Sequence, residues 1–299
     1  MPPLPRFCWV DGVLLRATEH HISAFDRGFQ LGDGVFETLR ARAGQVTELQ
    51  EHMTRLKTSA DGLEIRLPES MATEMERAIA ELLAAEGLTG TDADAAIRIT
   101  VTRGATLGRG LLPPEEGAEP TIVVQAWAAV PPPAERLERG LSIVASQVRR
   151  DPSNPLAALK TTARADYVFA RLEARRAGAD DALFLTNDGF LLEATSANLF
   201  LVQGDDVATP AIDCGILSGT TRGWVLGWAR RAGLGTREGW LTTRDLVDAD
   251  EAFLSSSVAG ILPVTRFEGE PVGSGRPGPI TGQARAAREQ FVLTGDSGP

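Results

Sequence analysis

Hydrophobic residues recur along the chain with two spacings, and each spacing predicts one kind of secondary structure. Spacings of three and four residues, as at Met53, Leu56 and Ala60, are typical of an amphipathic helix. Short runs rich in valine, isoleucine and threonine, as in residues 96–103, are typical of strands. Helices are expected at residues 49–63, 68–86, 161–177, 220–232 and about 280–291. Strands are expected at residues 8–10 and 13–16, which form a hairpin, at 96–103, 121–130, 141–148, 182–186, 190–202 and 251–255, and in a second hairpin around 268–270.

Three consecutive prolines, Pro131 to Pro133, separate two groups of these elements. Proline neither continues a helix nor donates to a strand ladder, so the run predicts a stiff, extended connector. Helices and strands are mixed on both sides, which predicts a two-domain α/β protein. The expected parts are a small α+β domain at residues 1–128, a linker at 129–135 and a larger domain at 136–299.

Charge and hydropathy narrow the classes of function. Thirty basic and forty acidic residues give a formal net charge of −10, and no dense basic cluster favours a nucleic-acid partner. No apolar run is long enough to span a bilayer, so no membrane partner is expected. The first residues lack the apolar stretch of a secretion signal, and a cytoplasmic location is therefore expected.

Cysteine and histidine are scarce. Cys8 and Cys214 lie far apart in the sequence and form no disulfide framework. The three histidines, His20, His21 and His52, show no metal-ligand spacing with them. Neither a metal site nor a serine-histidine-aspartate triad is expected.

Only two of the thirty basic residues are lysines, Lys57 and Lys160. Lys160 follows an apolar run and precedes two threonines at the expected start of a helix. Desolvation there would lower the pKa of the amine and make it a nucleophile, although a surface lysine with a buried stem is the commoner case. Lys57 lies on the polar side of its helix and is expected to be solvated.

The expected helix at 220–232 begins after Ser218 and Gly219. Its free backbone N–H groups and the hydroxyls of Thr220 and Thr221 favour an anion such as phosphate. An ordinary Ser/Thr N-cap explains the same pattern equally well.

Six segments match one family in order and spacing. They are residues 25–37, 51–56, 159–161, 193–200, 215–222, and 255–257 with 263–264. Together they resemble the class IV, or fold-type IV, pyridoxal-phosphate aminotransferases over nearly the whole chain. That family includes D-amino-acid transaminases, branched-chain transaminases and aminodeoxychorismate lyase. The resemblance implies a larger domain of pseudo-barrel form, pyridoxal 5′-phosphate as cofactor, and a homodimer.

The resemblance also implies a role for each matched residue. Lys160 is expected to form the Schiff base and then move the substrate proton. Glu193 is expected to keep the pyridine nitrogen protonated, which makes the ring an electron sink. Arg55 is expected to grip the cofactor phosphate. The expected cofactor contacts are Arg55, Lys160, Glu193, Ser196, Leu217, Gly219, Thr220, Thr221 and Ser257.

Departures from the family pattern leave the sub-family open. Branched-chain enzymes usually carry a tyrosine five residues after the lysine, where this chain has Ala165. The Gly-Asp-Gly segment at 32–34 is more like the D-amino-acid enzymes and the lyase, but Phe36 stands where D-amino-acid enzymes have tyrosine. Arg98 and Arg109 are candidate ligands of the substrate carboxylate, with Phe36 adding apolar surface.

The expected reaction transfers an amino group, preferably from a D-amino acid, to a 2-oxo acid through a Lys160 aldimine in ping-pong half-reactions. Small D-amino acids, and also (R)-amines, fit the expected site. The alternatives are aminodeoxychorismate lyase, which releases 4-aminobenzoate and pyruvate, and branched-chain L-amino-acid transamination. Arg164 and the loop at 103–110 favour the lyase. No dedicated second carboxylate site for its ring-bearing dicarboxylate substrate is evident from the sequence.

Overall fold

The computed structural model describes residues 4–114 and 118–295. Contacts divide the chain into two compact units. Unit 1 consists of Met1–Val130 with Leu159–Arg164, and unit 2 consists of Pro131–Ala158 with Ala165–Pro299. The three prolines thus stand where the chain first passes from unit 1 to unit 2. The sequence did not predict that Leu159–Arg164 would belong to unit 1. The expected domain bounds, 1–128 and 136–299, stay a prediction.

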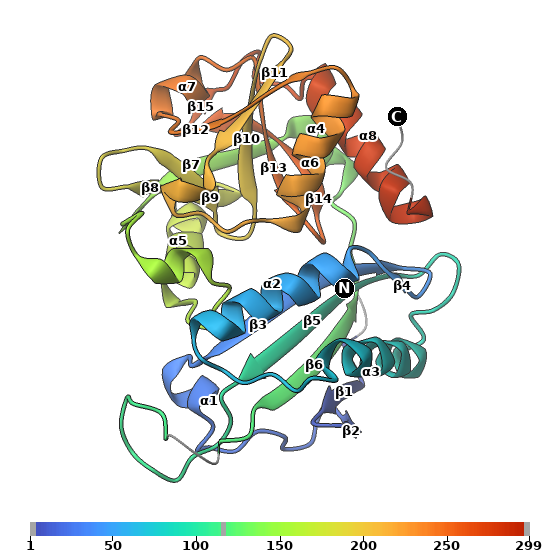
Figure 1. The fold of residues 1–299 in the computed structure, drawn as a ribbon. Helices are drawn as coiled ribbons and strands as arrows, with labels where there is room; N and C mark the ends of the chain where they lie inside the picture. Colours follow the sequence, from blue (N-terminus) through green and yellow to red (C-terminus); the bar gives the residue numbers. More distant parts are fainter. Residues whose placement is uncertain (1–3, 115–117, 296–299) are drawn as a thin grey trace. The chain divides into compact units, whose positions relative to one another are not determined.

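Unit 1 is built on a six-stranded antiparallel sheet of order β2-β1-β6-β5-β3-β4. The strands are β1 (Phe7–Val10), β2 (Val13–Arg16), β3 (Gly34–Arg42), β4 (Gln45–Val46), β5 (Asp94–Thr102) and β6 (Thr121–Ala128). A short helix, α1 (Arg27–Leu31), precedes β3. Helices α2 (Leu49–Gly62) and α3 (Met71–Glu86) lie along one face of the sheet (Figure 1). The hairpin and both amphipathic helices are therefore confirmed to within a few residues.

The two faces of this sheet carry different kinds of side chain. Side chains alternate along a strand, so Val35, Leu39 and Ile97 point toward α2 and α3 and are fully buried in one hydrophobic core. Phe36 and Arg98 point to the other face, because Phe36 pairs with Thr100 and Thr38 pairs with Arg98. We call this other face, which carries Phe36 and Arg98, the site face.

Residues 159–164 complete unit 1 by covering the beginning of β3. Thr161 forms an antiparallel bridge with Val35, and the N–H of Thr162 donates to the carbonyl of Gly34 at 2.8 Å. The expected helix at 161–177 is therefore wrong at its start, and α5 (Ala165–Arg176) begins four residues later. The backbone groups of residues 160–162 are already used by β3 and are not available to a helix.

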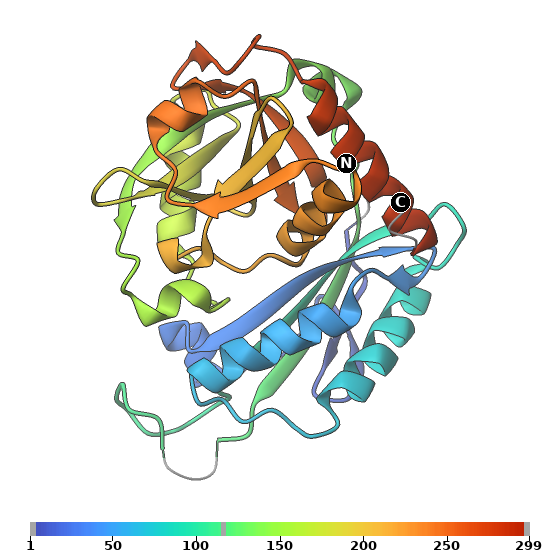
Figure 2. The same cartoon turned by 45° about the horizontal axis from the view of Figure 1, so that its top comes forward.

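Unit 2 contains a nine-stranded sheet that closes on itself. Its strands are β7 (Leu141–Arg150), β8 (Asp181–Thr186), β9 (Leu191–Ala194), β10 (Asn198–Gln203), β11 (Asp206–Pro210), β12 (Gly235–Gly239), β13 (Glu251–Ser256), β14 (Gly260–Phe267) and β15 (Glu270–Pro271). The order β10-β13-β14-β7-β8-β9 returns to β10 through the pair Asn198 and Glu193 (Figure 2). The expected barrel-like domain is thereby confirmed.

Helices cover this barrel. They are α4 (Ala134–Arg139), α5, α6 (Thr220–Arg231), α7 (Thr243–Val247) and α8 (Pro279–Thr294), with single turns at Pro155–Ala158 and Ile212–Cys214. α6 and α8 pack on β13 and β14 through a core that includes Phe200, Val225 and Phe253. The helices expected at 220–232 and 280–291 are confirmed.

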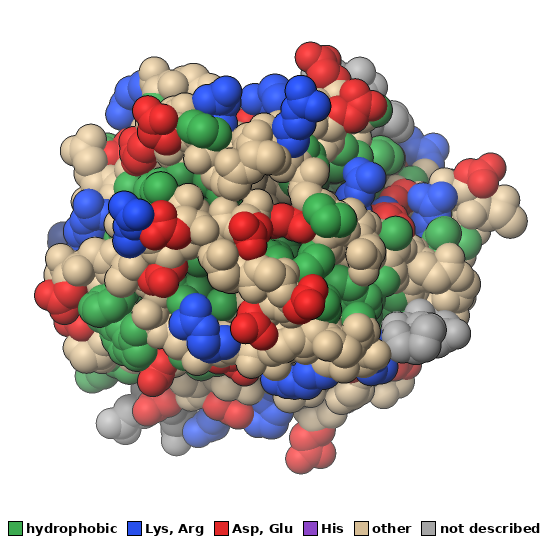
Figure 3. All heavy atoms as spheres, turned by 90° about the horizontal axis from the view of Figure 1, so that it is seen from above, with side chains coloured by type: hydrophobic (Ala, Val, Ile, Leu, Met, Phe, Trp, Pro, Cys, Tyr) green, Lys and Arg blue, Asp and Glu red, His purple; other side chains and the backbone are tan. Residues whose placement is uncertain are grey.

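The distribution of charged side chains and the character of the helices can be compared with the expectations from the sequence. Acidic and basic side chains are interspersed on the face shown in Figure 3. Within residues 4–114 and 118–295, no helix is both long and apolar enough to cross a membrane.

Candidate active site

Lys160 is held against the site face of unit 1. Its carbonyl accepts the N–H of Phe36 at 3.0 Å, and its own N–H donates to Ser59 Oγ at 3.1 Å. The Nζ atom lies 4.7 Å from the centre of the Phe36 ring. The other lysine, Lys57, is 69% exposed and pairs with Asp61, so its expected solvation is confirmed.

Arg98 also lies at Phe36. Its guanidinium is centred 3.8 Å from the ring centroid, and its Nε donates to Thr100 Oγ1 at 3.1 Å. Arg164 lies near the same ring, at 5.6 Å. Burial, and then the nearby charge of Arg164, lower the pKa of Arg98. The structure thus brings Lys160, Phe36 and Arg98 together, as a substrate site would require.

Arg109 is placed elsewhere in unit 1. It is exposed on the loop after β5 and lines a cavity of about 530 Å³ together with Phe25, Leu31 and Leu111. Within the described residues 4–114, the structure shows no contact between the Arg109 side chain and Phe36. Arg98 is therefore the better placed of the two candidates for the substrate carboxylate.

Arg55 belongs to a buried charge cluster on the opposite face of the sheet. Its Nε and Nη2 donate to the two oxygens of Glu37 at 2.7 and 2.6 Å. His52 Nδ1 lies 2.7 Å from the same carboxylate, and both His52 and Glu37 are fully buried. Burial alone would raise the pKa of Glu37, but hydrogen bonds and charge from Arg55 and His52 outweigh it and lower the pKa to about 2. Glu37 therefore fixes the direction of the Arg55 fork.

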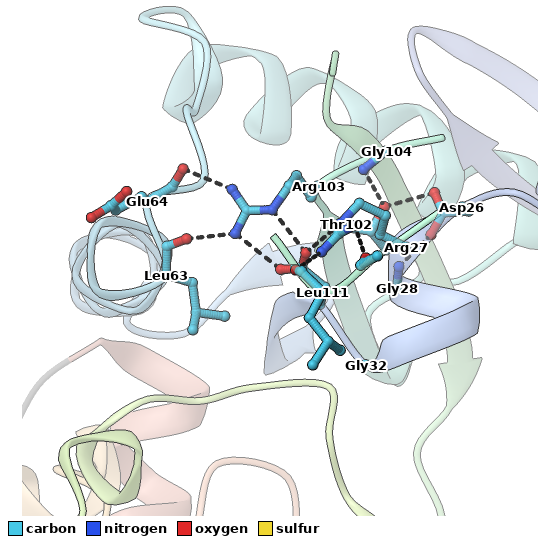
Figure 4. Close-up of polar contacts among 12 residues, drawn as sticks. Asp26, Arg27, Gly28, Gly32, Leu63, Glu64, Thr102, Arg103, Gly104 and Leu111 are labelled. Carbon is cyan, nitrogen blue, oxygen red and sulfur yellow. Dashed lines mark hydrogen bonds and ion pairs between the residues drawn. The ribbon is translucent and has the colours of Figure 1, made fainter. Parts of the chain in front are cut away.

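Asp33 of the Gly-Asp-Gly segment is part of an ion-pair network. Arg27 Nε and Arg103 Nε each donate to Asp33 Oδ2 at 2.8 Å. Burial raises the pKa of Asp33, but the hydrogen bonds from Arg103 and Arg27 outweigh it and lower the pKa. Arg103 also donates to the carbonyls of Leu63 and Glu64 at the end of α2 (Figure 4).

The same network holds the loop after β5. Arg27 donates from Nη1 to the carbonyl of Gly110. Its Nη2 donates to the carbonyl of Leu111 (Figure 4). The backbone geometry requires glycine at both positions beside Asp33. Gly32 has a φ of 68°, which closes α1 in the left-handed region, and a Cβ at Gly34 would lie 2.8 Å from the carbonyl oxygen of Val101. The segment that suggested a sub-family is thus explained by local structure.

In unit 2, Glu193 is buried and held by three donors. Its Oε1 accepts from Arg150 at 3.0 Å, and its Oε2 accepts from the N–H of Leu217 at 3.1 Å and from Asn198 Nδ2 at 3.4 Å. Arg150 itself stacks 3.6 Å from the ring centroid of Phe184. These contacts fix one carboxylate at the point where the barrel closes.

The beginning of α6 fits a phosphate group. The N-cap residue is Gly219, and no side chain caps the first turn, so the ordinary Ser/Thr cap does not apply. Thr220 Oγ1 lies 3.3 Å from Ser257 Oγ, which brings two hydroxyls to this helix end. A Cβ at Gly219 would collide with Asn198 Oδ1, so the close approach of Asn198 to this helix end requires glycine there.

The structure therefore brings together Lys160, Phe36 and Arg98 in unit 1, and Glu193, Leu217, Gly219, Thr220 and Ser257 in unit 2, whereas Arg55 and Arg109 lie apart from the first group. Ser196 is the least informative of the expected residues, since it is exposed in the turn between β9 and β10. Sequence reasoning missed Glu37, His52 and Asn198, although all three lie inside the matched segments. Arg150 lies outside them and gave no sequence signal.

Known proteins from three sub-families resemble this chain over most of its length. A protein of Methanocaldococcus jannaschii with the provisional name branched-chain-amino-acid aminotransferase is 36% identical over 95% of this chain and 94% of its own. The D-alanine aminotransferase of Bacillus licheniformis is 30% identical over 95% of this chain and 96% of its own. The aminodeoxychorismate lyase of Vibrio harveyi is 31% identical over 86% of this chain and 90% of its own.

Solved structures agree. The branched-chain amino acid aminotransferase of Escherichia coli matches with a TM-score of 0.89 at 27% identity, covering 97% of this chain and 95% of that one. The T.th. enzyme of the same name, complexed with N-(5′-phosphopyridoxyl)-L-glutamate, matches with a TM-score of 0.87 at 27% identity over the same shares. The family model described as amino-transferase class IV matches residues 34–267, which is most of the chain. The chain therefore belongs to the class IV aminotransferase family.

Proposed function

We propose that this enzyme is a pyridoxal 5′-phosphate-dependent transaminase that exchanges amino groups between amino acids and 2-oxo acids. When bound, the cofactor supplies an electron sink for the carbanion left after the substrate carbon loses its proton. The single observation that carries the proposal is the placement of Lys160. Its amine lies beside the Phe36 ring, and its backbone carbonyl accepts a hydrogen bond from Phe36 in β3.

Each unit, taken by itself, carries side chains of the required chemistry. In unit 1, Lys160 is the covalent attachment point and the base that moves the substrate proton, while Arg98 is the ligand of a substrate carboxylate. In unit 2, Glu193 holds a proton at the pyridine nitrogen. Thr220, Thr221 and Ser257, with the open N–H groups of α6, bind phosphate oxygens, and Arg55 adds a charged donor. A hydrogen bond to a charged group contributes about 1.5–3 kcal/mol, so several of them would retain the cofactor tightly.

D-amino acids are the proposed donors. The absence of a tyrosine five residues after Lys160 disfavours the branched-chain sub-family, and the D-alanine aminotransferase of Bacillus licheniformis is among the relatives. The second candidate is the lyase reaction. The observation in its favour is that the guanidinium groups of Arg98 and Arg164 both lie near the Phe36 ring. The lyase substrate carries two carboxylates, and two arginines could bind them.

The deciding experiment supplies purified holoenzyme with D-alanine, L-leucine and aminodeoxychorismate separately, with 2-oxoglutarate as acceptor for the two amino acids. Pyruvate and 4-aminobenzoate release without a D-alanine half-reaction would assign the lyase. A dominant L-leucine half-reaction would assign the branched-chain activity. D-alanine deamination with glutamate formation is the expected result.

A homodimer in the cytoplasm is the proposed assembly and location. Large apolar side chains are exposed in unit 1 around α1 and the loop after β5, and Phe25, Leu31, Leu107 and Leu111 line one hollow there. Exposed apolar patches are typical of protein interfaces. The exposed side chains are Ile22, Phe25, Phe29, Leu31, Leu107, Leu111 and Leu112. Both cysteines are buried free thiols, as suits a reducing compartment. Sedimentation should give a dimer for the parent and a smaller species for Leu111→Glu, and an active parent monomer would contradict the assembly.

A further inference from the structure

Arg288 of α8 is a charged side chain buried inside unit 2, with only 1% of the residue exposed. Its guanidinium is centred 5.1 Å from the ring centroid of Trp224 and 5.1 Å from that of Phe291. These rings belong to the hydrophobic core between the barrel, α6 and α8, or pack against it. An apolar side chain would fill the same place at a lower cost of desolvation, so the charge itself needs an explanation.

The guanidinium reaches the first turn of α6. Arg288 Nη2 donates to Thr221 Oγ1 at 3.3 Å, and Thr221 is also only 1% exposed. Thr221 is the second residue of α6 and follows Gly219, the N-cap of the helix end that fits a phosphate group. Because both side chains are buried, water does not compete for this hydrogen bond.

This hydrogen bond determines which way the Thr221 hydroxyl donates. A guanidinium has donors and no acceptor, so Thr221 Oγ1 accepts from Arg288 and keeps its own proton for another acceptor. Inside a helix, a threonine hydroxyl can donate to a carbonyl of the preceding turn. Thr221 lies in the first turn of α6, so no helical turn precedes it. An anion bound at the helix end offers the acceptor.

Thr220, the neighbouring phosphate candidate, has a neutral partner instead. Its Oγ1 lies 3.3 Å from Ser257 Oγ, and either of these two hydroxyls can be the donor. A hydroxyl that accepts from a cation is also the stronger donor, because successive hydrogen bonds polarise one another. The two threonines are therefore expected to differ in how far they depend on α8.

We infer that Arg288 is a positioning residue for the cofactor phosphate, which acts by orienting the Thr221 hydroxyl as a donor to a phosphate oxygen. The inference rests on the proposed function, which assigns the phosphate to the beginning of α6. It gives Arg288 no direct contact with the phosphate, so the effect of Arg288 should disappear when the Thr221 hydroxyl is removed.

The test compares pyridoxal 5′-phosphate with pyridoxal, which lacks the phosphate. Their dissociation constants are measured by absorbance titration of the full-length protein after its cofactor has been removed with hydroxylamine, and their ratio is the phosphate preference. The variants are Arg288→Met, Thr221→Val and the two combined. Arg285→Met is the control, because Arg285 lies one turn earlier on α8, carries the same charge and is partly exposed.

Arg288→Met is expected to lower the phosphate preference about tenfold, as the loss of one charge-assisted hydrogen bond would, and to leave the pyridoxal constant unchanged within about twofold. Once Thr221→Val is present, adding Arg288→Met should change the preference by less than about twofold. In a Thr220→Val background, Arg288→Met should keep its full effect. Arg285→Met should leave the preference intact.

An Arg288→Met protein with the phosphate preference of the parent overturns the inference. Equal weakening of both ligands also overturns it, because the role of Arg288 would then be structural. Effects of Arg288→Met and Thr221→Val that multiply in the combined variant overturn it as well, since Arg288 would then not act through Thr221. If Arg288→Met does not fold, Arg288→Lys keeps a charged donor and should retain more of the preference than Arg288→Gln, which keeps a neutral one. Equal preference in those two variants overturns the inference.

The outcome is separable from that of the proposed function, because the phosphate preference requires no turnover. A protein whose preference depends on Arg288 through Thr221 but which transfers no amino group would contradict the transaminase assignment alone. A protein that transfers amino groups while Arg288→Met keeps the preference of the parent would contradict the role of Arg288 alone.

Discussion

The N–H of Phe36 and the carbonyl of Lys160 are joined by a hydrogen bond of 3.0 Å. This bond links the strand that carries the ring to the segment that carries the amine. The bridge between Val35 and Thr161 continues the pairing by one residue. The ring and the amine therefore keep their relative positions as one rigid element, which is the preorganisation that a reacting amine needs.

Replacing Lys160 by alanine is expected to remove the yellow colour of the purified protein after dialysis and to reduce transamination to background. The reason is the loss of the covalent attachment point and of the proton-transferring base. Lys57→Ala is the matched control, because it removes the other lysine, which is exposed and paired with Asp61. A Lys160→Ala protein that stays yellow and active would show that another group performs both tasks.

Glu193→Gln is expected to lower turnover about a hundredfold or more, the size typical of losing one preorganised electrostatic group. Cofactor uptake and folding should persist, because glutamine has nearly the same shape. Asp166→Asn is a suitable control, since Asp166 pairs with the same Arg150 at 3.3 Å and has no assigned catalytic task. Unchanged turnover in Glu193→Gln would mean that a different acid serves the pyridine nitrogen.

Arg55→Ala is expected to weaken cofactor retention more than turnover at saturating cofactor, because Arg55 is assigned to the phosphate and not to the reacting carbon. The protein should also lose about 3–5 kcal/mol of stability, since Glu37 remains buried without its bidentate partner. Cofactor release during dialysis and kcat at excess cofactor separate the two effects. Equal retention by parent and variant would remove Arg55 from the site.

Glu37 gives a pH dependence whose sign is fixed. Its pKa is about 2 in the folded protein and 4.5 ordinarily, so the stability it contributes is present above about pH 4.5 and is lost as the pH falls toward 2. Over that window the unfolding free energy should fall by about 1.4 kcal/mol for each pH unit through this one group. Glu37→Gln should be less stable at pH 7 and show a shallower acid limb in denaturant titrations. An acid limb of the same slope would mean that Glu37 is protonated normally.

Asp33→Asn is expected to destabilise the protein by about 3 kcal/mol, because it leaves Arg27 and Arg103 without their shared carboxylate. The loop anchored by Arg27 at Gly110 and Leu111 should exchange its amide hydrogens faster. Asp61→Asn, which breaks an exposed pair, should cost under about 1 kcal/mol. Unaltered exchange at the loop would separate Asp33 from loop anchoring.

The strongly periodic elements were predictable, and β3 was not. Helices α2 and α3 repeat buried residues at helical spacing, so their sequences alone were sufficient. In β3, the side chains still alternate between the two faces, but the alternation of apolar and polar residue types is broken at Phe36 and Glu37. Phe36 is apolar on the site face, and Glu37 is charged on the core face, where it forms an ion pair with Arg55 and lies 2.7 Å from His52 Nδ1. The two residues that obscure the strand pattern are thus Phe36, which is proposed to contact the substrate, and Glu37, which holds Arg55.

Partners distant in sequence explain the remaining differences. Thr161 and Thr162 read as a helix start, but their backbone groups pair with β3, more than a hundred residues earlier. Likewise Arg98 reaches Phe36 only through the register of β3 and β5, which no local pattern specifies. The matched segments identified Lys160 and Glu193 as candidates, whereas the contacts that hold them required the fold.

Because the chain is synthesised from its N-terminus, the pairing of residues 159–164 with β3 also matters during synthesis. A nascent chain is made from its N-terminus, so the sheet of unit 1 leaves the ribosome long before these residues do. Until they emerge, the beginning of β3 is an uncovered strand edge that invites pairing with other chains. A fragment ending at the three prolines would keep that edge permanently, and is expected to aggregate although its hydrophobic core is complete. The segment that carries Lys160 is thus expected also to protect the newly made protein from aggregation.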